Sequence, residues 1–207
     1  MIHESLYSRK SNLLIGFHGC DKSVYDRIVS GIDSLKPSKN DYDWLGHGIY
    51  FWENNYIRAL QWAKDCANNP KSSITVPAVI GAVIDLGFCL DLMDSEYLVE
   101  LRWAYETLKK SAELKGMDLP RNYDPHESPD RFFRKLDCSV IETLHRLYKD
   151  SQLPEYDSVR GVFWEGNDLY PGAGFKEKNH IQICVRNPNC IKAYFCPRLI
   201  DTDFPNP

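Results

Sequence analysis

The sequence of 207 residues lacks any apolar run that approaches the roughly 20 residues of a membrane-spanning helix. Its longest apolar stretch, Val76 to Leu92, is interrupted by proline, glycine and aspartate. Residues 1–10 are polar and lack the apolar core of a signal peptide. These absences argue against a membrane protein or a secreted one, and we expect the chain to be cytoplasmic.

Cys-x-x-Cys pairs are also missing from the seven cysteines: Cys20, Cys66, Cys89, Cys138, Cys184, Cys190 and Cys196. The even spacing of the last three suggests a metal site. Structural zinc sites, however, usually take ligands about two to four residues apart, with a second pair elsewhere. We therefore expect no metal, and we interpret the cysteines as reduced and mostly buried thiols.

No Gly-x-Gly-x-x-Gly follows a candidate strand, which argues against a dehydrogenase. Neither sign of charge dominates, because 29 acidic and 25 basic residues leave a net charge of −4. The chain as a whole is therefore not drawn to nucleic acid or membrane, although a local basic surface is not excluded. Hydrophobic residues make up 43% of the chain, which is enough for one core in a single domain, residues 1–207.

Helical patterns fill the middle of the chain, and strand patterns lie at both ends. Helices are predicted at about 22–30, 55–68, 96–114 and 128–148, with Asp21 capping the first and Asn54 or Asn55 the second. Strands are predicted at 13–17, 47–52, 78–86, 158–164, 181–185 and 191–195. A sheet must then pair distant segments, which predicts an α+β domain with a helical insertion near 93–153.

Apolar residues recur at helical spacing within the predicted helices. We expect the following to face the core: Val24, Ile28, Val29, Ile57, Leu60, Ala63, Phe132, Leu136, Val140, Leu144 and Leu147.

Three short segments combine glycine, histidine, aromatic and polar residues: Gly16-Phe17-His18-Gly19-Cys20, Leu45-Gly46-His47-Gly48-Ile49-Tyr50-Phe51-Trp52 and Asn179-His180-Ile181-Gln182-Ile183-Cys184-Val185. Each has an ordinary structural explanation when taken alone. The histidine can be hydrogen-bonded after a strand, the glycines can form a tight turn, and the polar strand residue can face solvent. Their order along the chain is more informative.

In this order the segments resemble the ADP-ribosyltransferases of the diphtheria-toxin and poly(ADP-ribose) polymerase branch, which carry a His, Tyr, Glu signature. Phe-His-Gly-Cys is similar to the family's His-Gly-Thr/Ser. Leu-Gly-His-Gly-Ile-Tyr-Phe is similar to its Gly-x-Gly-Ile-Tyr-Phe, the most specific match. The resemblance covers the element order of the whole chain, and individual residues mainly at 13–63 and 157–195. It implies an ADP-ribosyltransferase-like split antiparallel sheet with flanking helices, and NAD+ as substrate.

The resemblance also implies a role for each matched residue. His18 binds the adenosine-side ribose, Gly19 pairs through its backbone with the carboxamide, and Tyr50 stacks on nicotinamide. These residue types suit the chemistry, because a glycine lets a ligand approach the backbone and an aromatic face attracts the positive pyridine ring.

A second stacking aromatic of the family falls on the next predicted helix. It corresponds to Trp62 if one extra residue is allowed, and to Gln61 without a gap. Core packing explains Trp62 about as well as stacking does. The family's nearby serine has no clear counterpart, because Arg58 or Ala59 lies there.

The third signature position departs from the family, whose strand begins with a catalytic glutamate. The best ungapped register places Gln182 there, which accepts hydrogen bonds but brings no negative charge. Glu165 and Glu177, in or beside the preceding loop, are alternative carboxylates. Loss of the glutamate implies transfer of single ADP-ribose units rather than chain building. In related enzymes the loop, here residues 166–178, contacts the acceptor, although a simple hairpin connection is equally consistent.

These observations predict a mono-ADP-ribosyltransferase, with the character of a bacterial toxin or phage-defence effector and an antitoxin protein as a further partner. Nucleic acid is slightly favoured over protein as acceptor, because five basic residues fall in the last strands: Lys176, Lys178, Arg186, Lys192 and Arg198. Solvated strand edges explain these residues too. Two alternatives stay open: an NAD+ glycohydrolase, and a module that binds NAD+ or ADP-ribose without catalysis.

Overall fold

A computed structural model describes residues 13–123 and 133–203 of the chain. Two sequence-based expectations lie outside these residues. One is the polar N-terminus at 1–10, and the other is the start of the last predicted helix at Ser128-Pro129, together with Phe132.

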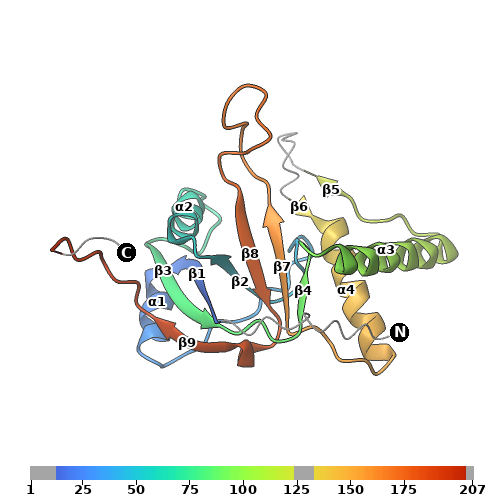
Figure 1. Ribbon diagram of the computed structural model, residues 1–207, viewed down its shortest axis with the longest axis horizontal. Helices are drawn as coiled ribbons and strands as arrows, with labels where there is room; N and C mark the ends of the chain where they lie inside the picture. Colours follow the sequence, from blue (N-terminus) through green and yellow to red (C-terminus); the bar gives the residue numbers. More distant parts are fainter. Residues whose placement is uncertain (1–12, 124–132, 204–207) are drawn as a thin grey trace.

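A seven-stranded sheet runs through the middle of the described chain (Figure 1). Its order is β4-β7-β8-β2-β1-β3-β9, and every neighbouring pair is antiparallel except β4 and β7. The strands are β1 (Leu14–Asp21), β2 (Ile49–Glu53), β3 (Pro77–Ile84), β4 (Cys89–Asp91), β7 (Ser158–Phe163), β8 (His180–Val185) and β9 (Ile191–Phe195). Distant segments pair as predicted, since β2 pairs with β8 and β3 with β9, and the mixed α+β class is confirmed.

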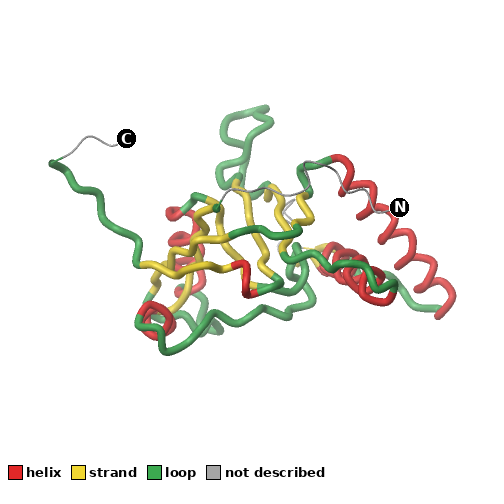
Figure 2. Tube along the Cα trace, turned by 60° about the horizontal axis from the view of Figure 1, so that its bottom comes forward, coloured by secondary structure: helices red, strands yellow, loops and turns green. Residues whose placement is uncertain are grey.

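Helices cover both faces of the sheet. Helix α1 (Lys22–Val29) buries Ile28 in a core cluster that includes Phe51, Ile80 and Ile183. On the opposite face, α2 (Tyr56–Ala67) packs over Trp52 and Val79. The far end of that face carries α3 (Ser95–Lys115) and α4 (Lys135–Asp150), which Figure 2 shows as a pair of helices to one side. A short pair, β5 (Asn122–Tyr123) and β6 (Phe133–Arg134), lies between α3 and α4 in the chain.

The predicted caps and the helical insertion are present. The Asp21 carboxylate accepts from the Ser23 N–H at the start of α1, and the Asn55 side chain accepts from the Arg58 N–H in α2. Helices α3 and α4 contribute Ala104, Ile141 and Leu144 to a core cluster with strand residues. The insertion therefore shares its core with the sheet.

Four details of the prediction were wrong. Strand β1 does not end at Phe17 but continues to Asp21, because pairing with β3 holds residues 18–21 extended. Residues 133–134 form a strand, and α4 begins only at Lys135. Three apolar helix residues point outward, Val24 at 38% exposure, Val29 at 40% and Ile57 at 67%. Each of their helices has only a narrow contact with the sheet, made by residues such as Ile28 in α1 and Ala59 and Ala63 in α2. Finally, Cys89–Asp91 was not predicted as a separate strand.

None of the helices in the described part of the chain is both long and apolar enough to cross a membrane.

A buried histidine makes the stability of this fold depend on pH. Burial lowers the pKa of His145 in α4 to about 3, and its two ring nitrogens have no hydrogen-bond partner among the described residues. Between pH 6.5 and the folded-state pKa, the unfolded chain therefore binds a proton that the folded chain does not, so stability falls as the pH falls.

We predict that His145 lowers the free energy of unfolding by roughly 2 kcal/mol between pH 6.5 and pH 5. The variant His145→Leu lacks this contribution to the pH dependence of stability. A weaker pH dependence remains in the variant, because burial also lowers the pKa values of His18 and His180. Urea unfolding at the two pH values measures the difference. Equal pH dependence in the variant and the parent protein would contradict the assignment.

Candidate ligand site where two strands part

The first two signature segments meet where β1 and β2 stop pairing. Their backbone register consists of Gly16 with Glu53 and Phe17 with Trp52, and it ends there. Just before β2, Gly48 exchanges hydrogen bonds with Ser38 of the preceding loop instead of with β1. The edge of β2 around Tyr50 therefore faces a gap between the two strands.

The His18 ring bridges this gap. Its Nδ1 lies 2.8 Å from the carbonyl oxygen of Tyr50, and because a carbonyl only accepts, Nδ1–H is the donor. Burial lowers the pKa of His18, against the opposing effect of the bond to Tyr50, so the ring is neutral near pH 7. Its Nε2 then carries a lone pair and has no hydrogen-bond partner among the described residues.

Gly19 presents its backbone to the same gap. Backbone groups alternate in direction along a strand, and Phe17 pairs with β2, so the N–H and C=O of Gly19 also point toward β2. No β2 partner remains at that level. A glycine is required here, because a Cβ would lie 2.5 Å from the Ala59 carbonyl oxygen and 3.1 Å from the Trp62 ring. Trp62, half-buried on α2, thus covers Gly19, whereas Gln61 is exposed.

The loop before β2 holds the side chain of Tyr50 in place. Its hydroxyl donates to the Gly46 carbonyl at 2.8 Å and accepts from the Leu45 N–H at 2.9 Å. Burial raises the pKa of Tyr50 well above its usual value, so the phenol stays protonated. The hydroxyl therefore both donates to and accepts from the loop, and the half-buried ring packs against the core cluster that contains Leu45.

Helix α4 fixes that loop from outside the sheet. Glu142 accepts from the His47 N–H at 2.8 Å and also pairs with Arg186 at the end of β8. Gly46 has a φ of +77°, and a Cβ there would meet the Glu142 carboxylate at 2.6 Å. The position of Tyr50 therefore depends on the helical insertion as well as on its own strand.

Gln182 lies on the same face as Tyr50, because it pairs with Trp52, two residues further along β2. The side chain is 9% exposed, and its Oε1 accepts from Trp44 Nε1 at 2.6 Å. Trp44 packs over Gly161 of β7, where a Cβ would meet its ring at 2.9 Å. Gln182 is thus held rigidly beside the gap by a residue of the loop that also anchors Tyr50.

The two alternative carboxylates are held in other contacts. Glu165 accepts two hydrogen bonds from Arg58 Nη2, at 2.6 and 2.7 Å, and both side chains are nearly buried. Releasing Glu165 would leave Arg58 buried without its partner, which typically costs about 3–5 kcal/mol. Glu177 is exposed and bonds Asn167 within the loop. The structure therefore places His18 against the Tyr50 carbonyl and Gln182 on the same sheet face as Tyr50, pairs Glu165 with Arg58, and leaves Glu177 exposed in the loop.

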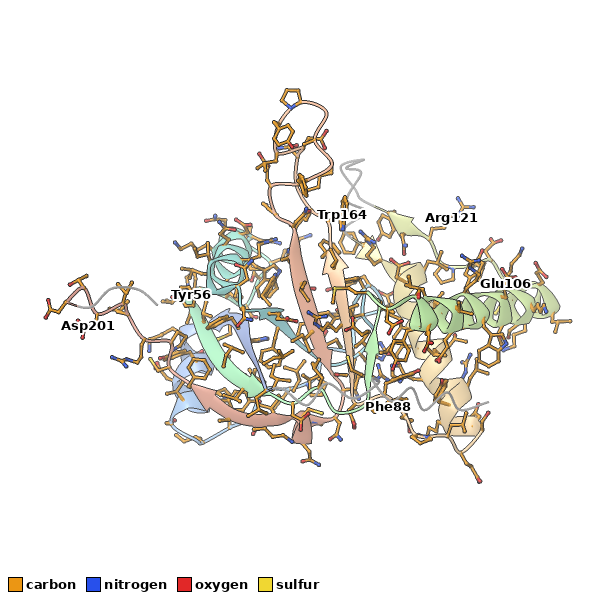
Figure 3. The ribbon with its side chains drawn as sticks, in the orientation of Figure 1. Tyr56, Phe88, Glu106, Arg121, Trp164 and Asp201 are labelled. Carbon is orange, nitrogen blue, oxygen red and sulfur yellow. The ribbon has the colours of Figure 1, made fainter. Side chains whose placement is uncertain are left out.

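The loop between β7 and β8, residues 164–179, projects from the sheet in the ribbon of Figure 1 and in the tube of Figure 2. Trp164 lies at its base in Figure 3, and the exposed aromatic residues are Trp164 at 54%, Tyr170 at 54% and Phe175 at 61%. Gly172 takes a φ of +76° where the loop turns back. The loop is therefore a protruding surface next to β8, the strand that carries Gln182.

The five basic residues of the C-terminal strands do not form one surface. Lys176 and Lys178 lie in the projecting loop, while Lys192 is on β9 at the opposite edge of the sheet. Most of them face an acidic partner: Lys176 faces Asp168, Lys178 faces Glu165, Arg186 faces Glu142 and Lys192 faces Asp85. Arg198 is exposed beyond β9. The positions of these basic residues therefore do not support nucleic acid as the acceptor.

Sequence reasoning missed Trp44, which holds Gln182, and Glu142, which holds the loop before β2, and it gave His180 no role. Trp44 had a signal, because it directly precedes the Leu-Gly-His-Gly-Ile-Tyr-Phe segment. His180 lies in the third segment but was passed over in favour of Gln182. Glu142 carried no signal, since its partners are 95 and 44 residues away.

All seven cysteines fall within the described residues and form no disulfide there; five of them are buried. Within residues 13–123 and 133–203, no group of three or more His, Cys, Asp or Glu side chains is arranged to hold a metal ion.

Comparison with known proteins finds one curated relative. The chain is 24% identical over 199 residues to an uncharacterized protein of Methanocaldococcus jannaschii, and the match covers 85% of this chain and 83% of the archaeal protein. No protein-family model and no solved structure matches the chain.

The close contact of Gly19 with α2 gives a test of the site's geometry. We predict that Gly19→Ala lowers the free energy of unfolding by about 1–3 kcal/mol, because the added methyl group meets a backbone carbonyl. Gly174→Ala is the matched control, since no heavy atom lies within 4 Å of its Cβ position. Urea unfolding measures both. Equal stability of the two variants would show that α2 does not cover Gly19 as described.

Proposed function

We propose that the chain is a mono-ADP-ribosyltransferase, which cleaves NAD+ between nicotinamide and ribose and transfers ADP-ribose to a macromolecule. The proposal rests on the ADP-ribosyltransferase-like order of three signature segments and on one structural observation. Where β1 and β2 part, the backbone of Gly19, the backbone carbonyl of Tyr50 and the neutral ring of His18 border the same gap.

The gap has the donors and acceptors that the nicotinamide end of NAD+ requires. A carboxamide both donates and accepts hydrogen bonds, as a strand edge does, so the unpaired N–H and C=O of Gly19 are complementary to it. The rings of Tyr50 and Trp62 suit a positively charged pyridine ring. The lone pair on His18 Nε2 is suited to a ribose hydroxyl.

The chemistry needs little from a general acid. When the bond from the pyridine nitrogen to the ribose carbon breaks, its electron pair stays on nitrogen and nicotinamide leaves as a neutral molecule. Positive charge develops on the ribose, an acceptor atom attacks that carbon, and the acceptor releases one proton. A site that holds NAD+ in one reactive orientation lowers the free-energy barrier to cleavage of this bond without a metal.

The projecting loop between β7 and β8 supports a macromolecular acceptor. Its exposed aromatic rings suit stacking on the bases of a single-stranded nucleic acid, which is worth about 1–3 kcal/mol per base. These exposed rings, and not the basic residues, favour nucleic acid over protein as the proposed acceptor. Hydrolysis of NAD+ by water uses the same gap, so product analysis must separate transfer from hydrolysis.

Incubation with NAD+ labelled in its adenylate part, in the presence of cell lysate, tests the proposal. We expect nicotinamide release and a label on macromolecules that nuclease removes and protease does not. Free ADP-ribose as the only product would indicate a glycohydrolase. Tight NAD+ binding without nicotinamide release would indicate a binding module.

His18→Ala and Tyr50→Ala are each expected to lower nicotinamide release at least about tenfold, since each loses more than roughly 1.4 kcal/mol of transition-state stabilisation. Gln61→Ala is the matched control, because this exposed residue lies next to Trp62 but does not cover Gly19. Thermal unfolding checks that the variants fold. Full activity in both folded variants would mean that the gap is not the site.

Gln182→Glu tests the departure from the family's signature. A carboxylate at this position still accepts from Trp44 Nε1 and adds a negative charge beside the positive ribose. We expect nicotinamide release to rise by about five- to tenfold, the value of roughly 1 kcal/mol. An unchanged or lower rate in a folded variant would show that position 182 does not face the reacting sugar.

A further inference from the structure

A row of aromatic rings extends from the gap across the sheet face and ends in buried polar atoms. The rings of Trp62 and Trp52 lie 5.5 Å apart, and that of His180 follows 6.1 Å from Trp52. The Arg58 guanidinium lies 6.0 Å from the Trp52 ring. These side chains are therefore neighbours in space, although they come from α2, β2 and β8.

Several polar atoms of this group have no hydrogen-bond partner among the described residues. They are Trp52 Nε1, Arg58 Nε and Nη1, and His180 Nε2, in residues that are 4%, 5% and 7% exposed. Buried polar atoms are nearly always paired, and an unpaired one costs about 1–3 kcal/mol. A cluster of such atoms beside a proposed ligand site indicates that a ligand supplies the missing partners.

The hydrogen bond of His180 determines what its unpaired nitrogen can do. His180 Nδ1 lies 2.6 Å from the Lys178 carbonyl oxygen, which only accepts, so Nδ1 carries the proton. Burial lowers the pKa of His180; the bond to Lys178 and the charge of Glu165 oppose this, and Arg58 adds to it. The ring is therefore neutral near pH 7, and Nε2 is an acceptor. Trp52 and Arg58 supply donors around it.

Gln182 is less available than His180 as a hydrogen-bond acceptor for a ligand. Its Oε1 already accepts from Trp44 Nε1 at 2.6 Å, which leaves chiefly the amide N–H groups for a ligand. His180 lies two residues earlier on β8, on the same face. The acceptor beside the gap is thus His180 Nε2, and Gln182 presents donors.

We propose that His180 accepts a hydrogen bond from a hydroxyl group of the nicotinamide-side ribose, while Trp52 and Arg58 donate to the oxygen of that hydroxyl. The inference rests on the proposed NAD+-cleaving function and assigns to His180 the contact that a glutamate makes in the resembling family. His180 only holds this hydrogen bond, and no proton moves to it. Its dipole stabilises the sugar as positive charge develops.

The experiment pairs a change in the protein with a change in the substrate. His180→Asn keeps an amide near the Nδ1 position but leaves nothing at Nε2, and His180→Gln places a polar group near Nε2. Nicotinamide release is measured with NAD+ and with its two analogues that lack the 2′- or the 3′-hydroxyl of the nicotinamide-side ribose. The intrinsic reactivity of each analogue is the same for every variant and cancels in the comparison.

We expect His180→Asn to lower kcat with NAD+ by about 5- to 100-fold with little change in KM, and His180→Gln to recover most of the loss. With one of the two deoxy analogues, His180→Asn should lower kcat by less than about threefold, because that analogue already lacks the hydroxyl group that His180 contacts. Equal losses on all three substrates would overturn the inference and leave the proposed function intact. Absence of nicotinamide release by the parent protein would overturn both.

If His180→Asn does not fold, Trp52→Phe replaces it in the same comparison. It keeps an aromatic ring in the row and removes the unpaired Nε1 donor together with part of the indole. A loss that is smaller with one deoxy analogue than with NAD+ supports the subsite, and equal losses on every substrate contradict it.

Discussion

The hydrogen bond between the His18 ring and the Tyr50 carbonyl is the interaction on which the site depends. Strands β1 and β2 stop pairing after Phe17 and Trp52, yet a buried carbonyl still needs a donor. A side chain that supplies it lets the strands part without leaving the carbonyl unpaired. The same bond sets the tautomer of His18 and so leaves its second nitrogen as an acceptor at the gap.

Around this bond, parts of the chain that are distant in sequence hold one another. Helix α2 presses Ala59 and Trp62 onto Gly19, so β1 tolerates only glycine at that level. Helix α4 holds the turn before β2 through Glu142, and the same loop carries Trp44 to Gln182. The insertion therefore supports the site although it contributes no signature residue. Because these supports are packed and hydrogen-bonded, the aromatic rings offered to a ligand are fixed before it binds, which lowers the entropy lost on binding.

Local patterns predicted most elements, whereas the proximity of the first two signature segments followed from the resemblance. The caps at Asp21 and Asn55 and the pairing of early with late strands follow from residue types that act over a few positions. What could not be predicted depends on long-range packing. The extension of β1 through His18 requires β3 alongside, and the pairing of Arg58 with Glu165 joins residues 107 positions apart. Likewise, no local signal shows that Trp44 already uses the acceptor of Gln182.

The central claim is that nicotinamide binds where β1 and β2 part, and a crystal structure of the protein with NAD+ or nicotinamide tests it most directly. The account predicts the carboxamide against the N–H and C=O of Gly19, with the ring between the side chains of Tyr50 and Trp62. A ligand bound at another place, with no contact to the backbone of Gly19, would contradict it.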